Sequence, residues 1–426
     1  MCLQSQEHQP WQLVPGQAAV VADALAAQRA RIGATRRRPG PLPPVEIRRD
    51  DLPPVRSTEA RRESPVGVDM TNQGVRVRDV PGVGEVLVKS PVRPGGVDRG
   101  TVLTAAAGRI SGVEVPETLG WVTGQDGSVV AVATVWVPEA VDGWTWAVDS
   151  VVAHLRGGDE PDWPHRLGAV AARMHHGLTE QLSPRGGWGA QEGAAAVNAL
   201  QRRFDRGADM ESALRESDQV TRRIVGRRLA AVDHARSSVR ALTGLEWSGP
   251  PAEPLAILHG DLHVGQVLRS PASPGSLFLT DFDGDPLDAA SPGDLSTDGG
   301  PSPGLAVEDL AHLAASVWMC APVAGRRLRV AGIRWDASLR EKAKNWGDRA
   351  AADLIRSYAE QSRLCQRRLP DPELTTALMR LQLVRELRYA AEHLPPWQYA
   401  GAGALELFVP ADRHHHEEHL WTPPPS

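Results

Sequence analysis

The sequence predicts an α+β fold in which a small β-rich lobe precedes a large, mainly helical lobe. The chain has 426 residues, which is too long for one ordinary hydrophobic core. Between residues 66 and 137, short apolar runs alternate with polar residues and turn signals, as strands do. After Pro138, apolar residues recur at three- and four-residue spacing, as in helices. We therefore expect three parts, at residues 1–64, 65–137 and 138–426.

The first part, residues 1–64, differs in composition from the rest of the chain. A helical stretch, GQAAVVADALAAQRARIG, precedes residues 34–65, which are rich in Pro and Arg and show no apolar periodicity. We interpret residues 34–65 as a linker or mobile arm. The whole N-terminal part is then either a cap on the small lobe or a mobile Pro/Arg-rich arm.

Strands dominate the predicted small lobe at residues 65–137. Three alternating runs separated by turn residues predict a meander whose last strand carries Lys89. The segment 98–111 has an Asp near its start and is predicted to be a helix. Two further strands are expected on either side of the turn QDGS. The predicted strands are residues 66–70, 75–80 and 85–90, then 118–124 and 128–137.

Helical periodicity in the large lobe is interrupted by two β-like runs. The apolar sequences LAIL and LFLT precede His259 and Asp281, respectively. We find no internal repeats. The predicted helices are residues 163–178, 218–242, 306–321, 339–364 and 373–394.

Composition and charge exclude several classes of protein. Hydrophobic residues make up 41% and charged residues 23% of the chain, as in ordinary globular proteins. Lys plus Arg number 47 and Asp plus Glu 52, so the net charge of −5 gives no reason to expect binding to nucleic acid or to an anionic membrane. The apolar stretches are too short to span a bilayer, and no secretory signal is visible. With three widely spaced cysteines we expect a cytoplasmic protein, whether monomer or homodimer.

Two short motifs come directly after the two β-like runs and carry the chemistry. The first, HGDLHVGQVL, places Asp261 at the end of an apolar run and Gln266 five residues later. The second, DFDGDP, begins with Asp281. A carboxylate at the edge of a core can orient a hydroxyl and accept its proton. An amide oxygen and a second carboxylate are ligands that Mg²⁺ accepts beside phosphates and water, so the set suits phosphoryl transfer.

Lys89 completes this set from the small lobe. A lysine on the third strand of an N-terminal meander can neutralise the α- and β-phosphates of a nucleotide. Taken singly, Lys89 is better explained as a surface lysine, and Asp281 as a turn residue. The joint spacing of Asp261, Gln266 and Asp281 is the feature that favours a kinase site.

In these features the chain resembles the aminoglycoside phosphotransferase-like kinases, which have a two-lobed, protein-kinase-like fold. The shared order is a strand Lys, then His-Gly-Asp, an amide residue five positions later, and Asp-Phe. The two motifs and the hinge segment VWVPEAVDGWTWA are particularly similar to the actinobacterial maltokinase and glucosamine kinase branch. The C-terminal LQLVRELRYAAEHLPPWQY is closer to the glucosamine kinases, and the resemblance extends from Val66 to Tyr399.

The resemblance implies roles for the catalytic and nucleotide-binding residues. By it, Asp261 is the catalytic base, Gln266 and Asp281 are Mg²⁺ ligands, and Lys89 binds the phosphates of ATP. The adenine is implied to lie against the hinge. The hinge residues in question are Trp136 and Val137.

The same resemblance implies a substrate site on the C-terminal helix, where glucosamine contacts Gln382 and Glu386 and meets Trp397 as a wall. Gln382 and Glu386 are four residues apart and so share one helix face. A carboxylate is the natural partner of a sugar ammonium, and a Trp ring stacks on a sugar or a cation. A salt bridge from Glu386 to Arg385 or Arg388 is an almost equally good interpretation.

The sequence departs from the family pattern near the phosphates. No Gly-x-Gly-x-x-Gly loop covers them, and the helix predicted after Lys89 contains no Glu to orient the lysine. Either Glu114 or Glu117 pairs with Lys89, or no Glu does.

We therefore predict a kinase that uses ATP and Mg²⁺ to convert glucosamine to glucosamine 6-phosphate. A maltokinase that forms maltose 1-phosphate is the nearest alternative, and an aminoglycoside phosphotransferase is the next. A catalytically inactive nucleotide-binding scaffold is the alternative from another class. The missing Gly-rich loop slightly favours the scaffold, whereas the intact Asp261, Gln266 and Asp281 disfavour it.

Overall fold

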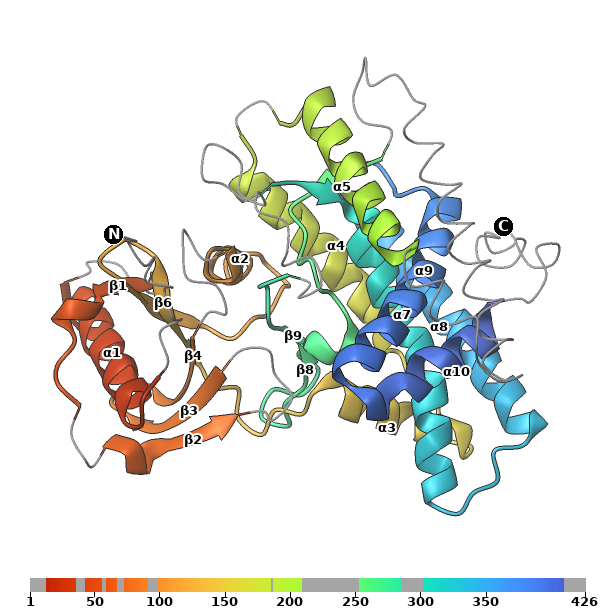
Figure 1. Cartoon of the computed structure of the whole chain (residues 1–426), viewed down its shortest axis with the longest axis horizontal. Helices are drawn as coiled ribbons and strands as arrows, with labels where there is room; N and C mark the ends of the chain where they lie inside the picture. Colours follow the sequence, from red (N-terminus) through yellow and green to blue (C-terminus); the bar gives the residue numbers. More distant parts are fainter. Residues whose placement is uncertain are drawn as a thin grey trace, which may run out of the picture.

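Two lobes of different composition lie side by side in the computed structural model of the chain (Figure 1). A sheet with one covering helix forms the smaller lobe, and helices form most of the larger one. The structure describes residues 13–35, 43–55, 59–66, 73–90, 99–184, 187–208, 253–284 and 302–409.

The small lobe contains a six-stranded sheet in the order β1-β5-β6-β4-β3-β2. The pairing of the second and third strands of the predicted meander is confirmed, because β3 pairs antiparallel with β4. On its other side, β3 pairs antiparallel with β2. The buried face of the six-stranded sheet packs against α1, whose Val21, Ala22 and Leu25 lie in the core of this lobe. The elements are α1 (Gln17–Thr35), β1 (Val45–Arg48), β2 (Glu63–Val66), β3 (Gln73–Val80), β4 (Gly84–Ser90), β5 (Thr118–Thr123) and β6 (Val129–Val135).

β1 lies within residues 34–65, and so do three of the four residues of β2. The prediction of a linker or mobile arm is wrong for these strand residues. β1 pairs in parallel with β5 and buries Val45 and Ile47, while β2 forms one edge of the sheet. Glu63 of β2 also accepts hydrogen bonds from the backbone of α1, at Gly16 N (2.7 Å) and Ala19 N (2.9 Å). The predicted strand at 66–70 lies outside the described residues beyond Val66.

The helix α2 (Arg99–Ala107) is encoded between two strands of the small lobe but packs in the core of the large one. Its Leu103, Ala106 and Ala107 are buried together with side chains of the helical lobe. The predicted boundary at residue 137 therefore does not separate the two cores. The helix itself is confirmed, although it ends before the predicted residue 111.

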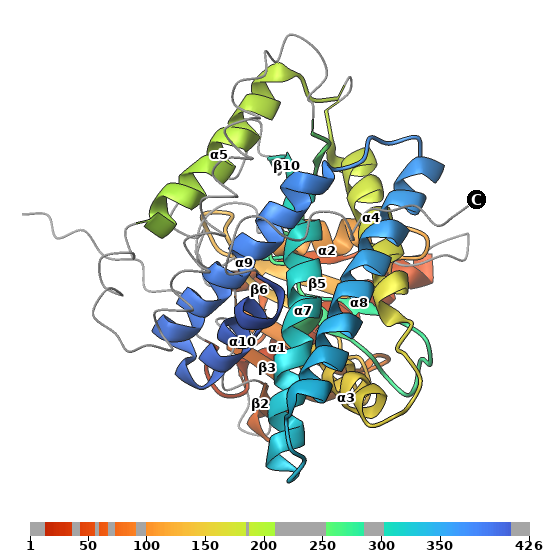
Figure 2. The same cartoon turned by 90° about the vertical axis from the view of Figure 1, so that its right-hand side faces the viewer.

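One helix, α7, forms the centre of the large lobe, with α8 and α9 on either side (Figure 2). Nearly every side chain of its first five turns is buried. The predicted helix at 218–242 lies outside the described residues. The helices are α3 (Gly143–Leu155), α4 (Trp163–Leu182), α5 (Ala190–Ala208), α7 (Ala306–Val330), α8 (Ala337–Leu364), α9 (Pro372–His393) and α10 (Gln398–Phe408).

Short strands carry the two motifs between the lobes. LAIL contributes β7, which pairs with β10, and LFLT contributes β9, which pairs with β8. The β8–β9 hairpin is tied to the segment before β5, because Leu279 N donates to Glu114 O at 2.8 Å. The short elements are β7 (Leu255–Ala256), η4 (Val264–Gln266), β8 (Val267–Leu268), β9 (Phe278–Leu279), β10 (Gly304–Leu305) and η6 (Pro395–Trp397).

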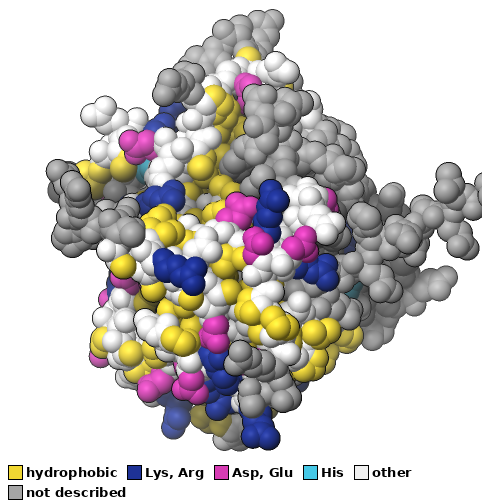
Figure 3. Space-filling model, turned by 90° about the vertical axis from the view of Figure 1, so that its left-hand side faces the viewer, with side chains coloured by type: hydrophobic (Ala, Val, Ile, Leu, Met, Phe, Trp, Pro, Cys, Tyr) yellow, Lys and Arg dark blue, Asp and Glu magenta, His cyan; other side chains and the backbone are white. Residues whose placement is uncertain are grey.

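The surface of the small lobe carries side chains of mixed character. At the small-lobe end of the molecule, basic and acidic side chains are interspersed among hydrophobic ones (Figure 3). Within the described ranges, no helix has the length and hydropathy that crossing a bilayer requires.

Candidate functional site

The segment that contains His259, Gly260 and Asp261 is held by Asp309, near the N-terminus of α7. Its carboxylate accepts hydrogen bonds from His259 N at 2.6 Å and Gly260 N at 3.0 Å, and it contacts His175 Nε2 at 3.0 Å. Burial raises the pKa of Asp309, but the hydrogen bond from His175 and nearby positive charge outweigh it and lower the pKa to about 2. This ionised carboxylate fixes the backbone that leads to Asp261.

His259 supports the motif from inside the core. Its Nε2 lies 2.8 Å from Thr280 O, and Asp261 N donates to its Nδ1 at 3.3 Å. The ring also packs against Phe282, with centroids 4.4 Å apart. Burial lowers the pKa of His259 to about 4, so the imidazole is neutral at neutral pH. These contacts make His259 a hydrogen-bonded support for the backbone around Asp261.

Strand pairing brings the two motifs together. The antiparallel register Val267↔Leu279 places Gln266 beside Asp281, and Thr280 N donates to Gln266 O at 2.9 Å. Gln266 Nε2 then lies 3.4 Å from Asp261 Oδ2 and 3.5 Å from Asp281 Oδ2. Residues that are up to 20 positions apart in sequence thus share one small polar site.

Lys89 reaches this site from β4. Its Nζ forms an ion pair with Asp281 Oδ1 at 2.7 Å. Burial raises the pKa of Asp281, but the Lys89 ammonium outweighs burial and lowers it. Of the two glutamates considered as partners of Lys89, Glu117 forms an ion pair with Arg29 of α1, and the side chain of Glu114 is exposed.

The donor set suits a hard cation held by few protein ligands. In the described residues, no group of three His, Cys, Asp or Glu side chains is placed to hold a metal. Mg²⁺ in phosphoryl-transfer sites needs only one or two protein oxygens, because phosphates and water complete its shell. Gln266 points its amide group at both carboxylates, and a flip that exchanges its amide N and O would aim Oε1 at the same place.

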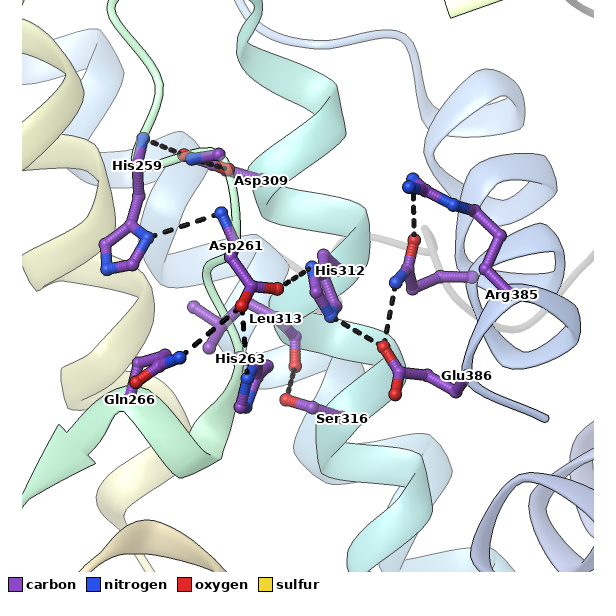
Figure 4. A network of polar contacts seen from close by, with 12 residues as sticks. His259, Asp261, His263, Gln266, Asp309, His312, Leu313, Ser316, Arg385 and Glu386 are labelled. Carbon is purple, nitrogen blue, oxygen red and sulfur yellow. Dashed lines mark hydrogen bonds and ion pairs between the residues drawn. The ribbon is translucent and has the colours of Figure 1, made fainter. Parts of the chain in front are cut away.

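A second carboxylate is connected to Asp261 through a histidine (Figure 4). His312 of α7 lies with Nδ1 3.7 Å from Asp261 Oδ1 and Nε2 3.0 Å from Glu386 Oε1. On α9, Gln382 Nε2 donates to Glu386 Oε1 at 2.9 Å, which confirms that the two share a helix face. Arg385 donates to Gln382 at 3.4 Å.

Electrostatics keep Glu386 ionised. Burial raises its pKa, but the hydrogen bond from His312 and the charges of His312 and His263 outweigh it and lower the pKa to about 2. The Glu386 side chain nevertheless remains 27% exposed. A negative group is therefore available near Asp261 at neutral pH.

Aromatic side chains line the site beside His263, whose Nε2 lies 3.7 Å from Asp261 Oδ2. Trp144 stacks on His263 with centroids 6.0 Å apart, and Trp397 lies 5.6 Å from Trp144. Burial lowers the pKa of His263 to about 4. Trp397 thus belongs to an aromatic group that begins at His263, beside Asp261.

The two hinge residues come directly after β6. Trp136 N donates to Glu85 O at 2.9 Å, and its ring lies under the Arg76 guanidinium at 4.7 Å. Val137 is buried. By strand register, Trp136 lies opposite Glu85, so it shares a sheet face with Lys89, opposite the face that α1 covers.

Sequence reasoning missed three residues that organise the site, namely Asp309, His312 and Arg99. Asp309 and His312 are three apart in AVEDLAHLAAS, so they lie on one face of a helix that is otherwise apolar. Polar residues within such a buried pattern are a usable signal. Arg99 at the start of α2 has no comparable signal, because a basic residue at a helix end is common.

Comparisons with known proteins give a consistent result. No family model matches the sequence. The chain is 31% identical over 366 residues to a glucosamine kinase of Mycolicibacterium smegmatis (strain ATCC 700084 / mc(2)155), covering 83% of this chain and 81% of that protein. It is 31% identical over 353 residues to a glucosamine kinase of Streptacidiphilus jiangxiensis, covering 80% and 72%. A solved glucosamine kinase in complex with glucosamine, ADP and inorganic phosphate superposes with a TM-score of 0.60 at 27% identity, over 82% of this chain and 76% of that one.

Proposed function

Because the chain belongs to the glucosamine kinase family, we propose that it transfers the γ-phosphoryl group of ATP to glucosamine and forms glucosamine 6-phosphate. The observation that carries this proposal is the chain of contacts from Asp261 through His312 to Glu386. In this arrangement Asp261, which can accept a proton, lies at the same site as the ionised carboxylate of Glu386. A substrate with both a hydroxyl and an ammonium group requires such a pair.

Asp261 is proposed to be the catalytic base. It orients the sugar hydroxyl, whose oxygen bonds to the γ-phosphorus while the bond from that phosphorus to the leaving ADP oxygen breaks. The hydroxyl proton passes to the Asp261 carboxylate. Gln266 and Asp281 would hold Mg²⁺, which supplies neutralisation of phosphate charge when it is bound with ATP. Lys89 exchanges its ion pair with Asp281 for contacts with the phosphates, and adenine lies against Trp136 and Val137.

Glu386 is proposed to bind the ammonium group of glucosamine, with Gln382 orienting it. The low pKa of Glu386 keeps it negative at the pH at which the sugar amine carries a proton. Trp397 provides an apolar wall for the sugar ring. A neutral disaccharide such as maltose does not need this carboxylate, which favours an amino sugar over maltose. We also propose that the reaction takes place in the cytoplasm, where unpaired cysteines such as Cys320 are ordinary.

A coupled ADP-release assay with ATP and Mg²⁺ tests the proposal, with glucosamine, glucose, maltose and kanamycin compared in parallel. Turnover that is confined to glucosamine, with the phosphate on the 6-hydroxyl by nuclear magnetic resonance, is the expected result. Turnover of maltose in place of glucosamine would assign the chain to maltokinase chemistry. Absence of turnover with all four would overturn the proposed substrate.

A further inference from the structure

Arg99, the first residue of α2, joins the two segments that carry the carboxylates of the site. Its guanidinium donates from Nη2 to Leu258 O at 2.8 Å and from Nη1 to His259 O at 3.1 Å. Nη1 also donates to Phe282 O, on the second segment, at 3.1 Å. One side chain therefore binds the backbone of both motifs.

Two glycines make room for this guanidinium. Gly260 and Gly284 have φ angles of 91° and 90°, a region that other residues rarely adopt. A Cβ on Gly260 would lie 3.0 Å from Arg99 Nη1, and one on Gly284 would lie 2.8 Å from the same atom. A larger residue at either position would displace Arg99. The guanidinium and both backbone segments are therefore fitted to one another.

The pair Asp281–Phe282 is held from two sides. Lys89 binds the Asp281 side chain at 2.7 Å, and Arg99 binds the Phe282 carbonyl. A planar guanidinium has five donors in a fixed fork and can bind several carbonyls at once, which a lysine ammonium does less well. The helix α2, which follows Lys89 and lacks the expected Glu, thus supplies Arg99, which binds backbone carbonyls of the two segments.

We propose that Arg99 is a positioning residue for phosphoryl transfer. It fixes residues 258–261, which end in the proposed base, against residues 281–284, which begin with the proposed metal ligand. The three carbonyls that it binds lie in both segments, so it acts through the positions of Asp261 and Asp281. The kinetic part of this inference rests on the proposed function, whereas its structural part does not.

The test compares Arg99→Ala and Arg99→Lys with Arg173→Ala in the full chain. Arg173 of α4 is a matched control, because its Nε donates at 3.2 Å to the carbonyl of Gly112. Gly112 has a positive φ angle, as Gly260 and Gly284 have, but it lies outside the two motifs. We expect Arg99→Ala to lower kcat for glucosamine roughly 100-fold with little change in KM, since small misplacements of reacting groups have effects of this size. Arg99→Lys should give an intermediate loss, and Arg173→Ala should keep kcat.

Hydrogen exchange distinguishes a local effect on the two segments from a general loss of stability. We expect Arg99→Ala to lose amide protection at 258–262 and 281–284 while protection in α7 and α8 is retained. Unchanged kcat and unchanged exchange in these segments would overturn the inference. If Arg99→Ala does not fold, kcat and hydrogen exchange of Arg99→Lys test the inference in the same way. If the wild-type protein does not phosphorylate glucosamine, the proposed function fails, and exchange alone decides the role of Arg99.

Discussion

At the scale of single residues, the surroundings of each titratable side chain in the site set its charge. Glu386 and Asp309 are ionised because histidines donate to them, and both have pKa values of about 2. His259 and His263 are held neutral by burial, with pKa values of about 4. Ionised carboxylates and neutral imidazoles therefore lie together in one small site.

Asp261→Asn should lower kcat strongly while leaving the protein folded. The amide keeps the shape of the side chain but cannot accept the hydroxyl proton, and general base catalysis contributes about 10²- to 10⁴-fold. Steady-state ADP release with glucosamine measures the loss. Asp149→Asn is a control, because Asp149 is an exposed residue paired with Arg327. Unchanged kcat in Asp261→Asn would remove Asp261 from the reaction.

Glu386→Gln should raise the KM for glucosamine about 10- to 100-fold, because a charge-assisted hydrogen bond to the ammonium contributes about 1.5–3 kcal/mol. The KM for ATP, which does not contact Glu386 in the proposed arrangement, should change little. Glu373→Gln changes an exposed carboxylate on the same helix and serves as the control. A lower kcat with an unchanged KM for glucosamine would indicate that Glu386 acts only through His312.

At the scale of elements, the burial of titratable side chains sets how the free energy of unfolding depends on pH. His176, His259 and His263 each have a pKa lowered from 6.5 to about 4, with burial as the largest cause. The unfolded chain binds protons at these residues between pH 6.5 and 4, and the folded chain does not, so stability falls as pH falls through this window. Glu253, whose pKa burial raises to about 7, has the opposite effect.

We expect the three histidines to outweigh Glu253. The free energy of unfolding in urea should therefore fall by on the order of a few kcal/mol between pH 7.5 and pH 5. Substituting His176 by Gln should reduce this dependence. A flat or rising stability over the same range would show that these imidazoles are not buried as neutral groups.

Elements also show what the sequence could and could not predict. Long helices such as α8 and the alternating strands β3 and β4 carry enough periodicity to be predicted within a few residues. β1 and β2 have four residues each and lie among Pro and Arg, so their pairing depends on neighbouring strands that a local pattern does not contain.

The residues of the candidate site also differ in whether the sequence predicts them. Asp261, Gln266 and Asp281 were predictable together because their fixed spacing is itself the signal. The contact of Asp309 with His259 spans 50 positions, and that of His312 with Glu386 spans 74. Each of these contacts depends on helix packing, which spacing in the sequence does not determine.

At the scale of the whole molecule, the N-terminal helix is part of the small lobe. Leu25 of α1 is fully buried against the sheet. Leu25→Ala should therefore lower the free energy of unfolding by about 2–5 kcal/mol, measured by urea denaturation. Leu364→Ala, at a residue that is 79% exposed, should have almost no effect. A negligible change for Leu25→Ala would support the mobile-arm interpretation of residues 1–64.

Dividing the protein at the hinge would cut through its core. A fragment that ends at residue 137 would carry α2 without the helices that bury Leu103, Ala106 and Ala107. It would also deprive Arg99 of the three carbonyls that it binds. We therefore expect the small lobe to be inseparable from the rest. Exchanging it between relatives would require α2 to be kept with the helices of the large lobe that bury it.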